Sequence, residues 1–255
     1  GTYILSQRPG RFLELPSIVI SLQDVEELTR VARSERMFEL GAGLTFDRIL
    51  RLGENNVPGA LYEAVRSIGP PAIRGLATLG GNLAIPGRLM TATPILTLLD
   101  ARIELRRQGG ARWIPVTRFH QQDGSLDLKE GEIVTRIRIP LQQWSVEVFR
   151  RFGSELSPES DPLTFCGLAR MSNGIVEELR VNGTASGRTT LRSKTMEAEL
   201  KKESDPRMFG RGEIFHKYRF SNEKWRNLYE RMVINGEDFH PPWINESDIE
   251  TDIKE

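Results

Sequence analysis

The chain has 255 residues, which is long enough for two compact units with separate cores. Its 35 basic and 35 acidic side chains cancel, so it has no global field to attract nucleic acid or an anionic membrane. The single cysteine, Cys166, excludes an intrachain disulfide, and the chain alone cannot ligate an iron–sulfur cluster. No window approaches about 18 uninterrupted apolar residues. We therefore expect a protein without a membrane span, and its low cysteine content is consistent with the cytoplasm.

Segments rich in β-branched residues alternate with segments of helical period, which favours an α/β or α+β architecture. Residues 15–22 contain the run Ile18-Val19-Ile20 and predict a short buried strand. Residues 24–32 have the apolar spacing of a helix, and residues 39–45 predict the next strand. Residues 45–52 start with a threonine, a good N-cap, and predict a short helix.

The clearest amphipathic helix has apolar residues at positions i, i+3, i+4 and i+7, and Gly69-Pro70-Pro71 ends it. Its apolar residues are Leu61, Ala64, Val65 and Ile68. Residues 101–106 and 111–116 predict a hairpin that turns at Gly109-Gly110. Residues 132–139 predict a strand that ends at a proline.

A domain boundary is predicted close to residue 145, which divides the chain into residues 1–145 and 146–255. In the second part, residues 163–171 and 175–181 predict paired strands joined through Asn173-Gly174, a strong hairpin signal. Helices are predicted over residues 190–202 and 221–233. An acidic tail with little periodicity begins at about residue 237.

The segment Thr78-Leu79-Gly80-Gly81-Asn82 combines adjacent glycines with two polar side chains. Glycines let the backbone approach a ligand closely and adopt positive φ, and successive N–H groups can cradle a pyrophosphate. The alternative is an ordinary tight turn, which is the commoner use of a glycine pair. The residues of this segment leave both interpretations open.

Several segments together resemble the flavoprotein subunit of molybdenum hydroxylases, the xanthine dehydrogenase and carbon monoxide dehydrogenase medium-subunit family. Residues 73–82 are similar to the family's second flavin-binding loop, and Glu39-Leu40-Gly41-Ala42-Gly43-Leu44-Thr45 resembles its Ile-Gly-Ala-x-x-Thr segment. Residues 131–140 resemble its Gly-Glu-x-Ile-x-x-Ile-x-Ile-Pro strand, and residues 174–200 its small C-terminal domain. The resemblance implies a vanillyl-alcohol-oxidase-like FAD-binding domain over residues 1–145, followed by a small α+β domain over residues 146–255.

The resemblance also implies which residues bind FAD. The chain starts at the second glycine of the family's first flavin loop, so we expect a strand, a helix and half of that loop to be missing. We therefore expect the chain as given to bind FAD weakly or to be isolated without it. Thr91 occupies a position of the Ser-Asp pair that the family typically carries. Arg151 aligns near a family Lys or Arg at the edge of the isoalloxazine ring, and the alternative is that it is an ordinary basic residue at a strand edge. Arg88 neutralises a phosphate or is a solvated surface side chain. The predicted cofactor-binding residues are Gly1, Thr2, Thr78, Gly80, Gly81, Asn82, Thr91 and Arg151.

The function that the resemblance implies is that of an oxidoreductase component. The subunit would pass electrons from iron–sulfur clusters through FAD to NAD or another acceptor. The implied partners are an iron–sulfur subunit and a molybdenum-cofactor subunit, and a homodimer is also compatible. The alternative is a degenerate homologue without cofactor that acts as a scaffold or orphan subunit.

The remaining candidate residues favour structural roles. His120, His216 and His240 lie far apart in the sequence, without the spacing of metal ligands, so we expect no metal site and no catalytic residue in this chain. Cys166 sits in an apolar segment and is expected to be a buried small hydrophobe rather than a nucleophile.

Overall fold

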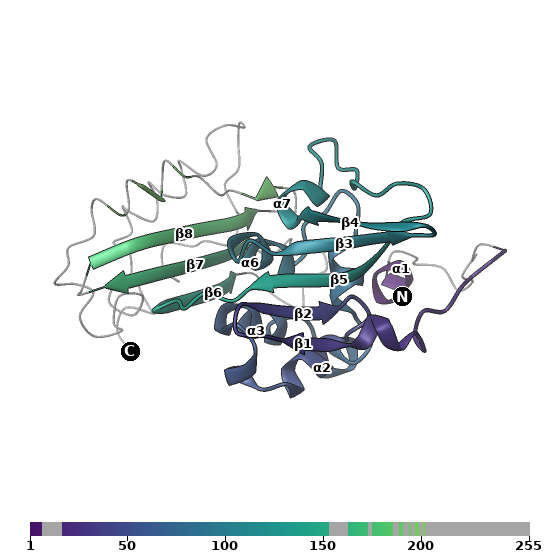
Figure 1. Ribbon diagram of the computed structural model, residues 1–255, viewed down its shortest axis with the longest axis horizontal. Helices are drawn as coiled ribbons and strands as arrows, with labels where there is room; N and C mark the ends of the chain where they lie inside the picture. Colours follow the sequence, from purple (N-terminus) through teal and green to yellow (C-terminus); the bar gives the residue numbers. More distant parts are fainter. Residues whose placement is uncertain are drawn as a thin grey trace. The chain divides into compact units, whose positions relative to one another are not determined.

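The structure is a computed structural model, which describes residues 1–6, 17–152, 163–172, 175–185, 189–190, 194, 197–198 and 201. The described residues belong to one compact unit within residues 1–203, and residues 204–255 lie outside the described part. The described elements are short helices and two antiparallel sheets (Figure 1), so the expected mixture of helix and sheet is confirmed.

The first sheet has five antiparallel strands in the order β1-β2-β5-β3-β4. Its centre is β5, where Ile137 lies opposite Leu40 on one side and Ile103 on the other. All three side chains are fully buried, because alternate residues of each strand face the core. The strands are β1 (Val31–Arg33), β2 (Met37–Gly41), β3 (Arg102–Arg107), β4 (Gly110–Pro115) and β5 (Ile133–Pro140).

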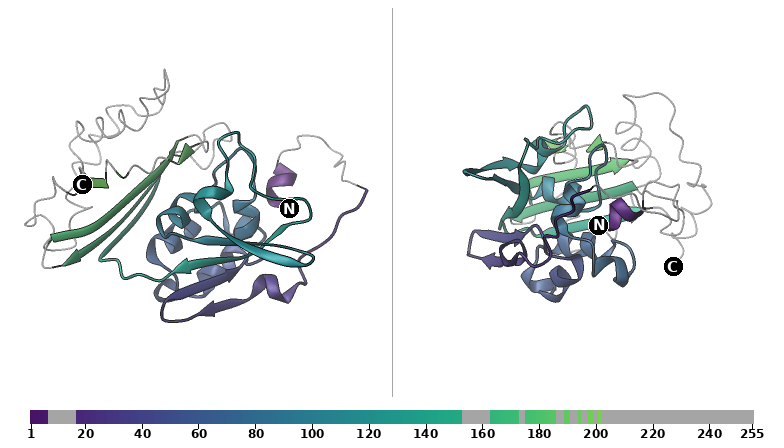
Figure 2. Two further views of the ribbon diagram at one scale, coloured as in Figure 1. Left: turned by 45° about the horizontal axis from the view of Figure 1, so that its top comes forward. Right: turned by 90° about the vertical axis from the view of Figure 1, so that its right-hand side faces the viewer.

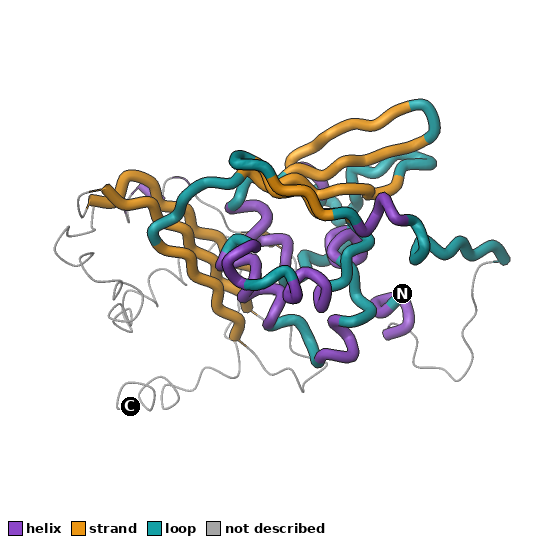
Figure 3. Tube along the Cα trace, turned by 60° about the horizontal axis from the view of Figure 1, so that its bottom comes forward, coloured by secondary structure: helices purple, strands orange, loops and turns teal. Residues whose placement is uncertain are grey.

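Helices pack on one face of this sheet and complete its core (Figure 3). The face of α3 that carries Leu61, Ala64 and Val65 is buried, as the apolar spacing predicts. Before this core the chain carries α1 (Thr2–Ser6) and η1 (Glu26–Thr29). The other helices are α2 (Phe46–Arg51), η2 (Glu54–Asn56), α3 (Gly59–Arg66), α4 (Pro71–Arg74), α5 (Leu79–Leu83), α6 (Ala92–Leu98) and α7 (Val116–Phe119).

The second sheet has the order β6-β7-β8-β9 and is also antiparallel. Figure 2 shows its two long strands, β7 and β8, side by side in both views. Helices of the first core contact it: Glu147 Oε2 accepts a hydrogen bond of 2.8 Å from the Ala60 N–H in α3, and Asn182 Nδ2 donates to the Pro94 carbonyl in α6 over 3.1 Å. The strands are β6 (Val146–Phe152), β7 (Leu163–Ser172), β8 (Ile175–Ala185) and β9 (Thr189–Thr190).

Two predicted elements are wrong. In the segment 15–22, residues 17–22 form no strand, and Ile18 and Ile20 are 78% and 77% exposed, because no strand of the described part pairs with them. The helix predicted over residues 24–32 is the short 3₁₀ turn η1 followed by strand β1. Pairing of β1 with β2 fixes that segment as a strand, because tertiary contacts override a weak helical period.

Other local predictions are confirmed. Thr45 caps α2, and its Oγ1 accepts from the Arg48 N–H over 3.3 Å. The β3–β4 hairpin turns at Gly109, whose φ of 87° favours glycine, and β7 pairs with β8. The turn at Asn173-Gly174, most of the helix 190–202, the helix 221–233 and the acidic tail lie outside the described residues, and the domain boundary at residue 145 stays a prediction.

Candidate functional site

The segment 78–82 begins a helix. Thr78 is the N-cap of α5 with extended backbone, and its Oγ1 accepts a hydrogen bond of 3.1 Å from the Gly81 N–H. Gly80 and Gly81 are helical, and neither has a positive φ. The tight-turn interpretation and the expected positive φ are therefore wrong, because a threonine cap organises these glycines as the first turn of a helix.

Most backbone donors of this turn are already used inside the protein. The Gly80 N–H donates to the Ala42 carbonyl over 2.8 Å, and the Asn82 N–H donates to the Thr78 carbonyl over 2.9 Å. The Gly81 N–H differs, since its partner is a side-chain hydroxyl. An anion approaching this turn could gain the Gly81 N–H by replacing the Thr78 hydroxyl, whereas the other two donors are bonded to backbone carbonyls.

The two glycines have different surroundings. Gly80 is buried, and a Cβ there would lie 2.6 Å from the Ala42 Cβ and 2.9 Å from the Ala42 carbonyl oxygen. Gly81 is exposed, and a Cβ there would meet only Thr78 Oγ1, at 2.8 Å. Gly80 therefore permits close packing, while Gly81 presents bare backbone beside a hydroxyl at the surface.

Two of the segments singled out in the sequence lie side by side here. The stretch 42–46 runs against 77–80: the Leu79 N–H donates to the Leu44 carbonyl over 3.0 Å, and the Phe46 N–H to the Ala77 carbonyl over 3.1 Å. Sequence reasoning found both segments but missed their pairing. The signal available was Gly80, since a Cβ there would lie 2.6 Å from the Ala42 Cβ in the neighbouring stretch.

Asn82 connects α5 to the start of α6. Its side chain is 7% exposed, and its Oδ1 accepts from the Ala92 N–H over 3.4 Å. Thr91, the N-cap of α6, precedes that residue, is half-buried and makes no side-chain capping bond. The structure thus links Asn82 with the neighbourhood of Thr91 and gives the asparagine a structural contact that the sequence did not predict.

The other predicted cofactor-binding residues come from separate elements. Arg151 lies on β6, and its Nη1 donates to the Ser67 carbonyl after α3 over 2.6 Å. Gly1 and Thr2 lie at α1, and residues 7–16, which lead from α1 to the rest of the chain, are outside the described part. The structure groups residues 78–82 with Thr91, and the cofactor role of every predicted residue stays a prediction.

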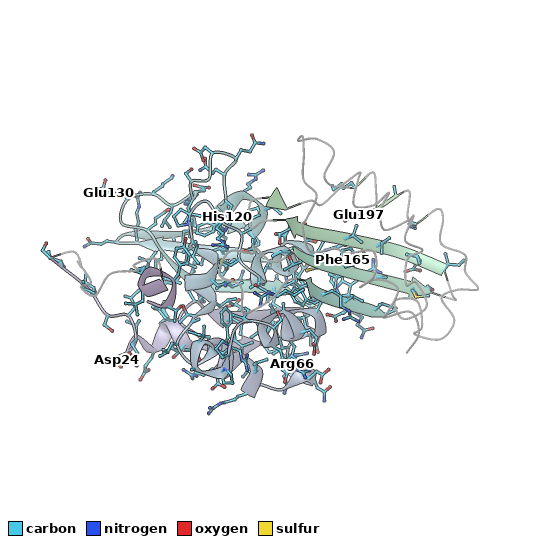
Figure 4. All side chains as sticks on the ribbon, turned by 180° about the vertical axis from the view of Figure 1, so that it is seen from behind. Asp24, Arg66, His120, Glu130, Phe165 and Glu197 are labelled. Atoms are coloured by element: carbon cyan, nitrogen blue, oxygen red, sulfur yellow. The ribbon has the colours of Figure 1, made fainter. Side chains whose placement is uncertain are left out.

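The described histidine and cysteine have structural surroundings. The ring of His120 packs edge-to-face on Phe119 with centroids 5.5 Å apart, and burial lowers the pKa of His120 (Figure 4 labels this residue). Cys166 is fully buried, and burial raises the pKa of its thiol, as expected for a small hydrophobe. Within the described ranges, no group of three or more His, Cys, Asp or Glu side chains could hold a metal ion. No helix of those ranges is long and apolar enough to cross a membrane.

Comparison with known sequences finds relatives of this chain among flavoproteins. The profile of a family described as "FAD binding domain in molybdopterin dehydrogenase" matches residues 4–142, more than half of the chain. The putative xanthine dehydrogenase FAD-binding subunit of Escherichia coli is 28% identical over 185 residues, 70% of this chain and 63% of the relative. The nicotinate dehydrogenase FAD-subunit of Eubacterium barkeri is 32% identical over 148 residues, 54% of this chain and 48% of the relative. The chain thus spans 48% to 63% of the length of these relatives.

Solved structures show the same fold. A carbon monoxide dehydrogenase from Hydrogenophaga pseudoflava matches with a TM-score of 0.67 and 19% identity, covering 89% of this chain and 74% of that chain. Quinoline 2-oxidoreductase from Pseudomonas putida matches with a TM-score of 0.63 and 21% identity, covering 69% of this chain and 62% of that chain. At these identities the likeness establishes the fold alone.

Proposed function

The chain belongs to the family of FAD-binding domains in molybdopterin dehydrogenases, and from this membership we propose that it is the FAD-binding subunit of a molybdenum-hydroxylase complex. The observation that carries the proposal is the profile match over residues 4–142, which includes both of the glycine-containing segments that the fold pairs. The relatives named as FAD subunits of xanthine and nicotinate dehydrogenases support the same role, that of an oxidoreductase component.

The residues at the start of α5 fit a flavin pyrophosphate. Gly81 leaves space that a side chain would fill, its N–H is held only by a hydroxyl, and Thr78 supplies that hydroxyl. Bound FAD would supply the redox chemistry, accepting and releasing electrons. In our proposal Thr78 and Gly81 hold the pyrophosphate, while Gly80 and Asn82 position the turn from behind. Thr91 adds a hydroxyl, Arg151 adds positive charge near the flavin, and Gly1 and Thr2 contribute from the position of the family's first flavin loop.

The partners in this proposal follow from the family membership. Electrons would reach this subunit from an iron–sulfur subunit and, before that, from a molybdenum-cofactor subunit, and the single cysteine of the chain is consistent with clusters that lie on another chain. The acceptor in this proposal is NAD or another oxidant. A cytoplasmic location and a homodimer are both compatible with the buried thiol and the balanced charge.

One observation favours a second candidate function. Because the N–H groups of Gly80 and Asn82 bond to backbone carbonyls, the turn is complete without a ligand. A cofactor-free homologue that acts as a scaffold would keep this geometry unchanged. The two functions differ in whether the full chain binds FAD.

A titration of the full chain with FAD, monitored by flavin fluorescence, distinguishes the flavoprotein function from the scaffold function. We expect the chain to bind FAD and Gly81→Val to weaken binding by about tenfold or more, because a branched side chain blocks the approach to the backbone and removes a charge-assisted hydrogen bond. Gly110→Val is the matched control, since a Cβ at Gly110 meets nothing within 4 Å.

Two outcomes would contradict the assignment. If the folded Gly81→Val protein binds FAD as well as the parent chain, the pyrophosphate does not lie at α5. If the parent chain does not bind FAD, the scaffold function replaces the flavoprotein function. Circular dichroism of both variants verifies that the fold is retained.

A further inference from the structure

A cavity of about 400 Å³ lies at one end of the first sheet, between the end of α6 and α7. Arg102 at the start of β3 and Pro115 at the end of β4 are opposite each other in the strand register and form part of its wall. Thr117 and Arg118 of α7 form another part, and Figure 1 shows α7 beside the end of β4. None of the lining residues belongs to the segments 42–46 or 77–82, so this cavity is separate from the proposed FAD site.

The rim of the cavity carries two positive charges without acidic partners. Arg102 is exposed, and its Nη2 donates to a neutral group, the Trp113 carbonyl, over 3.3 Å. Arg118 is exposed too, and neither guanidinium forms an ion pair with any residue that the structure describes. Most other described arginines near the first sheet are paired: Arg106, Arg112, Arg136 and Arg138 all contact carboxylates within 3.1 Å.

The acidic residue of the lining forms an ion pair with an arginine of the second sheet. Asp100 Oδ2 accepts a hydrogen bond of 2.6 Å from Arg180 Nη1, on β8. Asp100 also has a φ of 53°, a conformation that few non-glycine residues adopt, and Asp is among the residues that tolerate it. Arg180, which also pairs with Glu178, thus offsets part of the Asp100 charge, and Arg102 and Arg118 keep the net charge of the lining positive.

We propose that this cavity binds the phosphate group of a small soluble phosphate monoester. Guanidinium groups donate paired hydrogen bonds that match phosphate oxygens. A phosphate has enough oxygens to engage two guanidinium groups and the exposed Thr117 hydroxyl together, whereas one guanidinium saturates a planar carboxylate. The volume is at the lower end of the range for small-molecule sites, roughly 300–1,000 Å³, so the attached organic group is small.

A lipid phosphate is the other source of the same chemistry, and the surroundings favour the soluble ligand. Recognition of anionic lipid surfaces takes clusters of about four to eight Lys or Arg side chains. Among the described residues that line this cavity, the cations are Arg102 and Arg118.

The test uses the full chain and glycerol 1-phosphate as the probe, with binding followed by ³¹P NMR line width at constant ionic strength. Arg102→Gln and Arg118→Gln are each expected to weaken binding by about tenfold, the usual effect of losing a hydrogen bond to a charged group. Arg107→Gln is the matched control: it removes one exposed charge from the other end of β3, where the residue pairs with Gly110. Gly81→Val is expected to bind the probe as the parent chain does.

Each other outcome overturns the proposal. Equal weakening in all three arginine variants would mean a non-specific effect of surface charge. No saturable binding of the probe, or loss of binding in Gly81→Val, would mean that the cavity is not the site. Stronger binding to vesicles that contain phosphatidic acid than to glycerol 1-phosphate would replace the soluble ligand with a lipid. Arg118→Lys keeps the charge and is expected to retain more of the affinity than Arg118→Gln.

Discussion

Gly80 and Gly81 are neighbours in the sequence, yet only one of them is constrained by packing. A Cβ at Gly80 would overlap Ala42, which belongs to the adjacent stretch of backbone and cannot swing away. A Cβ at Gly81 would meet one rotatable hydroxyl. Packing against Ala42 therefore requires a glycine at position 80, whereas at position 81 the glycine leaves the backbone accessible at the surface.

Stability measurements can separate these requirements. Gly80→Ala is expected to lower the free energy of unfolding by about 1–3 kcal/mol, because the added methyl group overpacks the contact with Ala42. Gly81→Ala is expected to change stability by less than about 1 kcal/mol, because the helix preference of alanine offsets the displacement of the capping Thr78 hydroxyl. Urea denaturation of both variants checks the difference. Equal stability of Gly80→Ala and the parent chain would show that the α5 turn can move away from Ala42.

At the scale of elements, side chains of β8 donate hydrogen bonds to backbone carbonyls near both ends of α6. Arg180 donates to the Leu98 carbonyl over 2.6 Å and to Asp100 over 2.6 Å, and Asn182 donates to the Pro94 carbonyl. Arg180 also lies over the Trp144 ring, with its guanidinium carbon 4.8 Å from the ring centroid. With 9% of its side chain exposed, Arg180 is the main polar connection between the helix and the second sheet.

Removal of this connection is expected to be costly. Arg180→Met should lower the free energy of unfolding by about 2–4 kcal/mol, because it leaves a buried carbonyl and a carboxylate without their donor. Arg170→Met is the control, since the Arg170 side chain is 41% exposed and its ion pairs on the sheet surface should contribute less than about 1 kcal/mol. Urea denaturation compares the two variants. Similar small losses in both would contradict the structural role given to Arg180.

Local patterns predicted the elements whose determinants are local. The apolar spacing of α3, the Thr45 cap and the glycine turn between β3 and β4 each depend on residues within one or two turns of chain. The run Ile18-Val19-Ile20 has the composition of a buried strand, but burial requires a partner strand, and composition does not reveal whether one is present.

The sequence predicted which segments form the candidate site, but it did not predict how these segments contact each other. The sequence identified residues 39–45 and 73–82, but the hydrogen bonds from Leu79 and Gly80 to the 42–44 stretch are long-range contacts without a local signal. The hydrogen bond from the Gly80 N–H to the Ala42 carbonyl was missed for the same reason. The arginine-lined cavity was missed because Arg102 and Arg118 are separated along the chain and meet only where β4 returns to the start of β3.

At the scale of the whole molecule, buried carboxylates tie the strands of the first sheet together. Glu104 is 3% exposed; burial alone raises its pKa, but hydrogen bonds from Arg136 and Thr135 outweigh burial and lower the pKa to about 2. Hydrogen bonds from Arg112 and the Lys129 N–H lower the pKa of Glu132 to about 2. Both carboxylates connect β3 or β4 to β5 or the loop before it.

These lowered pKa values predict loss of stability in acid. The stabilisation is complete above the pKa of an unfolded glutamate, 4.5, and is lost as pH falls towards the folded value of about 2. We expect each group to contribute on the order of 2–3 kcal/mol to this loss. Urea denaturation at a series of pH values should therefore show a shallower dependence for Glu104→Gln than for the parent chain.

Glu130→Gln is the control for this experiment, because Glu130 is exposed and makes no hydrogen bond or ion pair with the described residues. It should leave the pH dependence unchanged. A pH profile of Glu104→Gln that follows the parent chain between about pH 4.5 and 2 would show that the Glu104 cluster does not drive acid unfolding.

The burial of Cys166 gives the molecule an internal reporter. It is the chain's one thiol, it lies in the middle of the second sheet opposite Phe149 and Asn182, and none of its surface is exposed. Burial also keeps the thiol protonated and unreactive while the sheet is closed. The rate at which a thiol reagent labels the native protein therefore measures how often the sheet opens at this position. Ligands that close the fold would slow that labelling without touching the sulfur.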